Sequence, residues 1–352
     1  MTSGHLCDIQ ARDVKTKRLT QRILHRGPTN GIPVVFIHGN FSSSTYFEEL
    51  MVSMPQDYYC IAVDLRGYGD TETAQIDATR GARDWSDDLH SLLQTLKIER
   101  AHFVGWSLGA APIMQLALDY PAFVWSLTLV APVSPFGFGG TRDEQGQFCN
   151  ADAAGSGAGM VAKEFVQRLH AKDHSRTDPA SPLNVIYSAY FYKLSHLNRE
   201  SHLLEGSLKQ ALGRYAYPGD SIASSNWPYT APGNAGPINA ISAKHYSMMA
   251  FASIDIKPRV LWIRGNKDDI VSNTSSSDIA ILGQTGLIPD WPGMTSYPPQ
   301  PMVDQTRYLL EQFRSNGGYY EEVVLNDVGH SPFIEAEAVF LPHFLTHLTF
   351  HQ

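Results

Sequence analysis

Six short runs of mainly apolar residues constrain the fold of this chain more than any other feature. They lack the polar–apolar alternation of a half-exposed strand, which indicates strands covered on both faces. Helical periodicity fills most of the intervals between them, for example over 85–96 and 108–120. Strand and helix in repetition predict an α/β fold with a doubly wound, mostly parallel sheet. The runs occupy residues 33–37, 59–63, 101–104, 127–130, 259–263 and 321–325.

Two further segments complete the expected architecture: one with alternating polar and apolar residues, and a long one without any buried-strand pattern. Residues 17–25 alternate polar and apolar side chains, which predicts an antiparallel edge strand. No buried-strand pattern occurs from 133 to 243, and we expect an inserted, mainly helical cap there, in a core domain of residues 1–132 and 244–352. The cap has a Gly-rich loop at 137–159 and helical patterns at 161–169, 183–194 and 203–215. A second irregular stretch, with five prolines, covers 287–302.

Composition and charge exclude several classes of partner. The 352 residues are 43% hydrophobic and 18% charged, and a net charge of -8 offers no basic surface for nucleic acid. We find neither an apolar run long enough for a membrane span nor a secretory signal in the first residues. The three cysteines are widely spaced, which argues against disulfides and a zinc pair and favours the cytoplasm. We expect a small-molecule substrate, no metal or cofactor, and a monomer or homodimer.

The strongest chemical signal is the segment Gly105-Trp106-Ser107-Leu108-Gly109, which follows a predicted strand and opens a predicted helix. In this context the Gly-x-Ser-x-Gly motif forms a sharp, strained turn that lifts the serine hydroxyl above the end of the sheet. Residues two before and two after the serine crowd together, so both need to be glycine. Ser107 is therefore the predicted nucleophile.

A serine nucleophile needs a base, and chain position selects one of the fourteen histidines. His330 belongs to the segment 327–332, which directly follows the last predicted strand, so it faces the same rim of the sheet as Ser107. A carboxylate must then orient the imidazole, and the adjacent residues Asp268 and Asp269 follow the preceding strand. The chain order of serine, acid and histidine fits either aspartate, and we prefer Asp268.

Backbone N–H groups are expected to stabilise the oxyanion of a tetrahedral intermediate. One donor is Leu108, the residue after the nucleophile. The second comes from the loop after the first buried strand, where Asn40 and Phe41 are equally good candidates. Aromatic side chains next to the nucleophile and in the cap are the expected substrate contacts: Trp106, Tyr187, Tyr190, Phe191 and Trp227.

Taken together, these motifs resemble the capped α/β-hydrolase superfamily. The resemblance rests on the serine motif, Asp268, and the segments His38-Gly39, Asp64-Leu65-Arg66-Gly67-Tyr68-Gly69 and Gly329-His330. It extends from about residue 32 to the C-terminus, apart from the cap and the proline-rich stretch. It implies the α/β-hydrolase fold and a serine–histidine–aspartate triad. Relatives that dehalogenate or open epoxides carry aspartate as nucleophile, so Ser107 argues against both activities.

The resulting hypothesis is a serine hydrolase that cleaves a carboxylic ester or lactone of a small, apolar or aromatic molecule. The reaction proceeds through an acyl-enzyme and requires no cofactor. Two alternatives stay open at this point. The same triad serves hydrolysis of a carbon–carbon bond in a diketone or ring-cleavage product, and a ligand-binding receptor that kept the fold would use the cap as a clamp.

Overall fold

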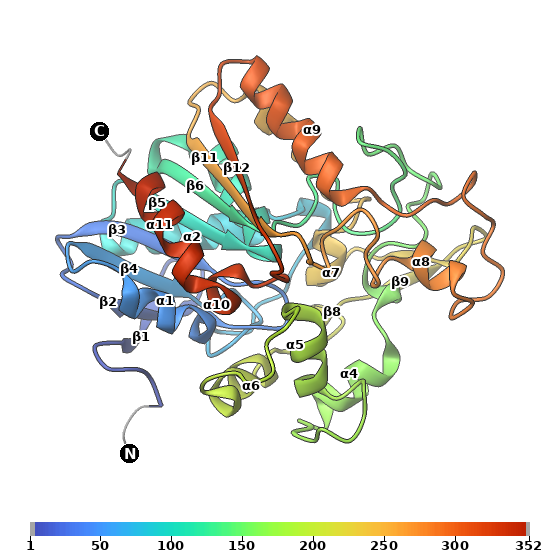
Figure 1. Ribbon diagram of the computed structural model, residues 1–352, viewed down its shortest axis with the longest axis horizontal. Helices are drawn as coiled ribbons and strands as arrows, with labels where there is room; N and C mark the ends of the chain where they lie inside the picture. The colour runs from blue at the N-terminus through green and yellow to red at the C-terminus, as the bar shows by residue number, and fades with distance from the viewer. Residues whose placement is uncertain (1–3, 350–352) are drawn as a thin grey trace.

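The computed structural model describes residues 4–349 and contains an eight-stranded sheet of order β1-β2-β4-β3-β5-β6-β11-β12 (Figure 1). β1, β2 and β4 pair antiparallel in that order, and the other neighbouring strands are parallel. Each of the six apolar runs forms a strand, so the predicted doubly wound, mostly parallel sheet is confirmed. The strands are β1 Gln10–Lys15, β2 Thr20–Arg26, β3 Ile32–Ile37, β4 Tyr58–Val63, β5 Ala101–Trp106, β6 Val124–Val130, β11 Arg259–Gly265 and β12 Tyr320–Leu325.

Helices cover both faces of the sheet. On β3, Val35 and Ile37 belong to the apolar core shared with α2, α3 and α9, whereas Val34 and Phe36 belong to the core shared with α1, α10 and α11. Both faces of the strand are therefore buried, which explains why its sequence shows no alternation. The helices are α1 Glu48–Ser53, α2 Arg83–Leu96, α3 Ala110–Asp119, α9 Met302–Ser315, α10 Pro332–Glu335 and α11 Glu337–Leu348. None of the helices within residues 4–349 is long and apolar enough to cross a bilayer.

One edge of the sheet is β1, which the sequence pattern does not reveal. Its residues are mostly polar and exposed, with only Val14 buried, so no apolar signal marks the strand. β2 overlaps the alternating segment 17–25 and lies between β1 and β4. The predicted antiparallel direction of this segment is confirmed, but its predicted edge position is wrong.

Between β6 and β11 the chain leaves the sheet and forms a segment of short helices, two pairs of short strands and long loops. Helices α4, α5 and α6 gather beside the sheet, in green in Figure 1. α5 ends at Tyr190 rather than near residue 194, because the N–H groups of Tyr192 and Lys193 bind Glu335 instead of continuing the helix. The elements are α4 Lys163–His170, α5 Pro182–Tyr190, α6 Glu200–Leu208, α7 Pro237–Ala240, and the paired short strands β7 Leu212–Gly213 with β8 Tyr217–Pro218 and β9 Ser221–Ala223 with β10 Thr230–Pro232.

The proline-rich stretch 287–302 follows α8 (Ile279–Gln284) and packs against the Gly-rich loop 137–159. The side chain of Gln300 donates to the carbonyl oxygen of Gly137 at 2.9 Å and accepts from the N–H of Gly139 at 2.6 Å. The hydroxyl of Tyr297 donates to the carbonyl oxygen of Ala154 at 2.9 Å. The stretch therefore fixes the Gly-rich loop.

Candidate active site

Ser107 lies at the turn between β5 and α3. Its φ of 55° is in the left-handed region, as a sharp strand-to-helix turn requires. A Cβ at Gly105 would lie 2.5 Å from the carbonyl oxygen of Gly109, and a Cβ at Gly109 would overlap the carbonyl oxygen of Ile37. Both positions therefore need glycine, as the motif predicts.

Ser107 lines a cavity of about 280 Å³ whose walls come from the core and from the segment between β6 and β11. The walls are mainly aliphatic and aromatic, and the polar side chains among them are uncharged. Within residues 4–349, no acidic, basic, histidine or cysteine side chain lines this cavity. The apolar lining consists of Phe41, Leu108, Val133, Phe138, Met160, Val161, Phe165, Val185, Ala189, Ile238, Ile241, Ile270, Val271 and Ile279, and the polar lining of Asn40, Ser107, Tyr190, Tyr217 and Ser277.

His330 and Asp268 form a buried pair. Nδ1 of His330 lies 2.9 Å from Oδ2 of Asp268, and the two side chains are 1% and 3% exposed. The N–H groups of Ile270 and Val271 donate to the other carboxylate oxygen, each at 2.9 Å. Asp269, by contrast, is exposed and hydrogen-bonded within its own loop. The structure thus brings Asp268, and not Asp269, to the imidazole.

Trp106 connects the serine turn to His330. Its Nε1 donates to the carbonyl oxygen of His330 at 2.9 Å, and the two ring centroids lie 5.7 Å apart. In the residue before His330, the N–H of Gly329 donates a hydrogen bond to Glu335 at 2.6 Å. These contacts hold His330 beside the residue that precedes Ser107. Trp106 is fully buried and does not line the cavity, which corrects its expected role as a substrate contact.

The predicted oxyanion loop reaches the same cavity. Asn40, Phe41 and Leu108 all line it, and Phe41 has a φ of 47°. Within residues 4–349 the N–H of Phe41 makes no hydrogen bond, and Leu108 lies in the first helical turn after β5, where N–H groups have no helical partner. Oδ1 of Asn40 accepts a hydrogen bond from the hydroxyl of Tyr68 at 3.0 Å. Two backbone donors, at Phe41 and Leu108, are therefore free.

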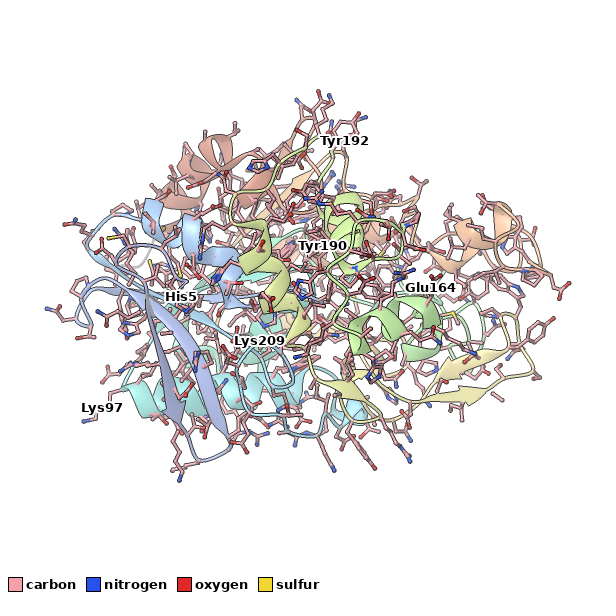
Figure 2. The ribbon with its side chains drawn as sticks, turned by 90° about the horizontal axis from the view of Figure 1, so that it is seen from below. His5, Lys97, Glu164, Tyr190, Tyr192 and Lys209 are labelled. Atoms are coloured by element: carbon pink, nitrogen blue, oxygen red, sulfur yellow. The ribbon has the colours of Figure 1, made fainter. Side chains whose placement is uncertain are left out.

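Tyr190, at the end of α5, bonds to both loops of the candidate site. Its hydroxyl donates to the carbonyl oxygens of Asn40 and Phe41, at 2.7 and 3.0 Å. Its own carbonyl oxygen accepts from the N–H of Ser331 at 3.0 Å, in the loop that carries His330. Tyr190 is buried, whereas Tyr192, two residues further, is exposed and lies near the upper edge of the view in Figure 2. Tyr190 lines the cavity, and its link to the oxyanion loop was not foreseen from the sequence.

Three other predicted substrate contacts lie outside the cavity. The hydroxyl of Tyr187 donates to Glu200 at 2.7 Å, and Phe191 packs beside Tyr187, with ring centroids 6.2 Å apart. Trp227 packs against Tyr297 at 4.8 Å between ring centroids, and its Nε1 bonds the carbonyl oxygen of Pro289. The structure corrects the expectation for these three residues, because their rings fill other parts of the protein.

Most residues of the cavity lining were not predicted from the sequence. Ile270 and Val271, for example, follow Asp268 directly, and their side chains line the cavity while their N–H groups hold the carboxylate. Their position beside the predicted acid was the available signal. Ile238 and Ile241 carry no such signal, because isolated aliphatic residues in a loop-rich segment show no pattern that distinguishes a cavity wall from a core.

Sequence comparison places the chain in a known family. The sequence profile described as the alpha/beta hydrolase fold matches residues 32–292, which is more than half of the chain. The chain belongs to the α/β-hydrolase fold family. This finding agrees with the resemblance drawn from the motifs and with the order of strands in the sheet.

Curated relatives and solved structures include several hydrolases. A 2-(acetamidomethylene)succinate hydrolase of Mesorhizobium japonicum is 34% identical over 120 residues, which is 34% of this chain and 42% of that protein. An uncharacterised carboxylesterase of Bacillus subtilis is 28% identical over 124 residues, 35% of this chain and 41% of the relative. The matches thus span less than half the length of these curated relatives.

The structures show similarity of fold over nearly the whole chain. The carboxylesterase CesB of Bacillus subtilis has a TM-score of 0.61 at 14% identity, covering 98% of this chain and 93% of that one. The 2-hydroxy-6-oxo-6-phenylhexa-2,4-dienoate hydrolase of a Rhodococcus strain has a TM-score of 0.59 at 15% identity, covering 97% and 99%.

Proposed function

We propose that this protein is a serine hydrolase that cleaves a carboxylic ester or lactone of a small, neutral, apolar molecule. The observation that carries the proposal is the position of Ser107. It lies on a strained turn in an uncharged, mainly apolar cavity, and the His330–Asp268 pair is held beside that turn. Membership of the α/β-hydrolase fold family and the hydrolases among the relatives support it.

In the proposed mechanism Oγ of Ser107 attacks the ester carbonyl carbon and passes its proton to Nε2 of His330. Asp268 holds the Nδ1–H of His330 and stabilises the imidazolium that forms. The N–H groups of Phe41 and Leu108 stabilise the oxyanion. The imidazolium then protonates the departing alcohol and leaves an acyl-serine. A water molecule, deprotonated by His330, attacks the acyl carbon, and the proton returns to Ser107 as the acid departs.

The cavity lining favours a neutral substrate over an anionic one. A carboxylate moved out of water requires a cation or several hydrogen-bond donors, and the cavity walls carry neither lysine nor arginine. Succinates and dienoates, which name the reactions of two of the proteins above, are anions. We therefore prefer a neutral ester or lactone to the carbon–carbon bond hydrolysis of an anionic ring-cleavage product. The volume is near the lower end of the roughly 300–1,000 Å³ of ligand pockets, which fits a small molecule.

The proposal is tested with two p-nitrophenyl esters of similar size, the valerate and the hemisuccinate, in which a carboxylate takes the place of the terminal ethyl group. We expect the neutral ester to have a kcat/KM at least about 100-fold higher, corresponding to about 2.7 kcal/mol. A fluorophosphonate should label the protein, and Ser107→Ala should remove both labelling and turnover. Preference for the hemisuccinate would contradict the substrate class. Binding of esters without labelling or turnover would identify a receptor instead.

A further inference from the structure

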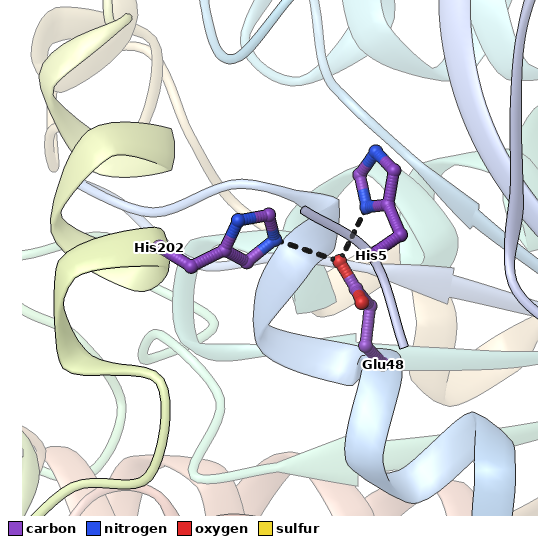
Figure 3. Close-up of side chains that lie close together, drawn as sticks. All are labelled: His5, Glu48 and His202. Atoms are coloured by element: carbon purple, nitrogen blue, oxygen red, sulfur yellow. Dashed lines mark hydrogen bonds and ion pairs between the residues drawn. The ribbon is translucent and has the colours of Figure 1, made fainter. Parts of the chain in front are cut away.

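His5, Glu48 and His202 form a second polar centre, outside the cavity that Ser107 lines (Figure 3). His5 precedes β1, Glu48 begins α1, and His202 lies in α6. Nδ1 of His5 and Nε2 of His202 lie 2.7 and 2.9 Å from the same oxygen of Glu48, Oε1. The three atoms lie within 4.8 Å of one another, and no other such trio of His, Cys, Asp or Glu occurs among residues 4–349. Sequence spacing gives no hint of this group, because its members come from three distant segments.

The second oxygen of Glu48 is held by two further donors. Nη1 of Arg199 and the N–H of Leu6 each lie 2.8 Å from Oε2. Carboxylates that bind metal ions are commonly fixed by such outer hydrogen bonds, which here leave Oε1 facing the two imidazoles. Glu48 is therefore an oriented ligand whose Oε1 faces both imidazoles.

We propose that Nδ1 of His5, Oε1 of Glu48 and Nε2 of His202 bind a divalent transition-metal ion, with Zn²⁺ as the best match. Imidazole nitrogen and carboxylate oxygen are ligands of zinc, and three protein ligands leave a fourth position for water. The proton on each facing nitrogen moves to the other ring nitrogen, so both rings stay neutral and each offers a lone pair to the ion. Arg199 stays on Oε2, where it does not compete for the ion.

Binding of the ion requires both imidazoles to shift. Zinc bonds of about 2.0–2.2 Å in a tetrahedral site separate neighbouring ligand atoms by about 3.3 Å. The two ring nitrogens therefore move about 0.5 Å away from Oε1, and their distance from each other, now within 4.8 Å, adjusts to the same spacing. The side chains of His5 and His202 are 17% and 24% exposed, so neither is locked by surrounding core.

A polar cavity of about 310 Å³ gives access to the two histidines. It has room for the water that completes the coordination, and its carboxylates lower the cost of bringing a hydrated cation to the site. Its charged lining beyond the histidines consists of Asp64, Asp70, Glu205, Arg22 and Lys209. A bound ion would join the N-terminal segment, α1 and α6, and so fasten the segment between β6 and β11 to the core.

The test is calorimetric titration of the EDTA-treated, dialysed full-length protein with ZnCl₂, together with its Tm. We expect one Zn²⁺ per chain with a Kd of roughly 10 μM or below, and a Tm that rises with Zn²⁺ because the ion binds the folded state. His202→Gln keeps an N–H donor for Glu48 but removes the imidazole, so the affinity should fall at least about 30-fold. His174→Gln is the matched control, because His174 is a half-exposed histidine of the same segment that pairs only weakly with Glu205, at 3.5 Å.

Three outcomes would overturn the site. They are the absence of saturable binding, an unchanged affinity in His202→Gln, and an equal loss in His174→Gln. His5→Gln is the second variant, with the same expected loss, and it leaves α6 untouched if His202→Gln disturbs the fold. Because binding is measured by heat and Tm, the result is independent of ester hydrolysis.

Discussion

Tyr190→Phe removes one hydroxyl group that connects the segment between β6 and β11 to the predicted oxyanion loop. The hydroxyl lies 2.7 Å from the carbonyl oxygen of Asn40 and 3.0 Å from that of Phe41. Burial raises the pKa of Tyr190 well above its usual value, so the hydroxyl keeps its proton and remains a donor. The carbonyl of Asn40 belongs to the same planar peptide as the N–H of Phe41. Holding this oxygen therefore also fixes the direction of the proposed oxyanion donor.

Two limits bracket the expected magnitude. A buried carbonyl that loses its donor costs about 1–3 kcal/mol, which favours rotation of the peptide toward another partner. Complete loss of one oxyanion donor would lower kcat by about 10²–10³. We expect a partial loss, with kcat about 10–100-fold lower, which is about 1.4–2.7 kcal/mol of the activation free energy. KM should change less than about threefold, because the aromatic ring that lines the cavity is retained.

The assay is steady-state hydrolysis of p-nitrophenyl valerate by the wild type, Tyr190→Phe and Tyr187→Phe. Tyr187 lies on the same helix, but its hydroxyl bonds Glu200 and the N–H of Leu197, away from the oxyanion loop. The control should keep kcat within about twofold of the wild type. The coupling is refuted if Tyr190→Phe also stays within that range, or if both variants lose kcat equally. A rise in KM alone would make Tyr190 a substrate contact only.

Four further predictions address the triad and the packing. Ser107→Ala should lower kcat on the order of 10⁶ with the fold retained, and residual activity of a tenth would exclude Ser107 as nucleophile. Asp268→Asn should cost on the order of 10⁴ in kcat and Asp269→Asn far less, while the reverse order would move the acid by one residue. Trp227→Ala should lower the free energy of unfolding in urea by about 3–5 kcal/mol, because the ring is buried, and a KM change without that loss would contradict its structural role. Glu48→Gln should lower the free energy of unfolding by about 2 kcal/mol at pH 7, measured with EDTA present. This loss is smaller than for a fully buried ion pair, because the partners of Glu48 are partly exposed. Because the pKa of Glu48 is depressed to about 2 from its usual 4.5, this difference from wild type should be complete above about pH 5 and shrink toward pH 2, and a pH-independent difference would refute the ion-pair origin.

The fold and the pairing of His330 with Asp268 could be predicted because the relevant signals are local in the sequence. A run of apolar residues becomes a buried strand, and the carboxyl ends of parallel strands meet at one rim. A residue directly after a strand therefore has a predictable place in space. β1 could not be found in this way, since its exposed polar side chains carry no pattern, and its pairing with β2 is a property of the assembled sheet.

The walls of the cavity could not be predicted because they depend on how irregular segments pack together. Trp227 is an aromatic residue of the kind expected to contact a substrate. It instead packs against Tyr297 of the proline-rich stretch and donates to the carbonyl oxygen of Pro289. Ile238 and Ile241 are aliphatic residues of the kind expected in a core, yet they line the cavity. Residue type alone does not separate these cases, since both environments are apolar.

Tyr190 connects the wall of the cavity to the loops that carry the proposed catalytic groups, so substrate specificity and reaction rate are coupled through this residue. One end of its side chain lies in the cavity wall, and its hydroxyl and its backbone carbonyl hold the two loops that carry the proposed oxyanion donor and His330. A substitution that reshapes α5 to admit a larger substrate therefore also shifts these loops. Displacement of an oxyanion donor changes transition-state binding more than substrate binding. Such variants should therefore show a lower kcat before KM for the larger substrate decreases.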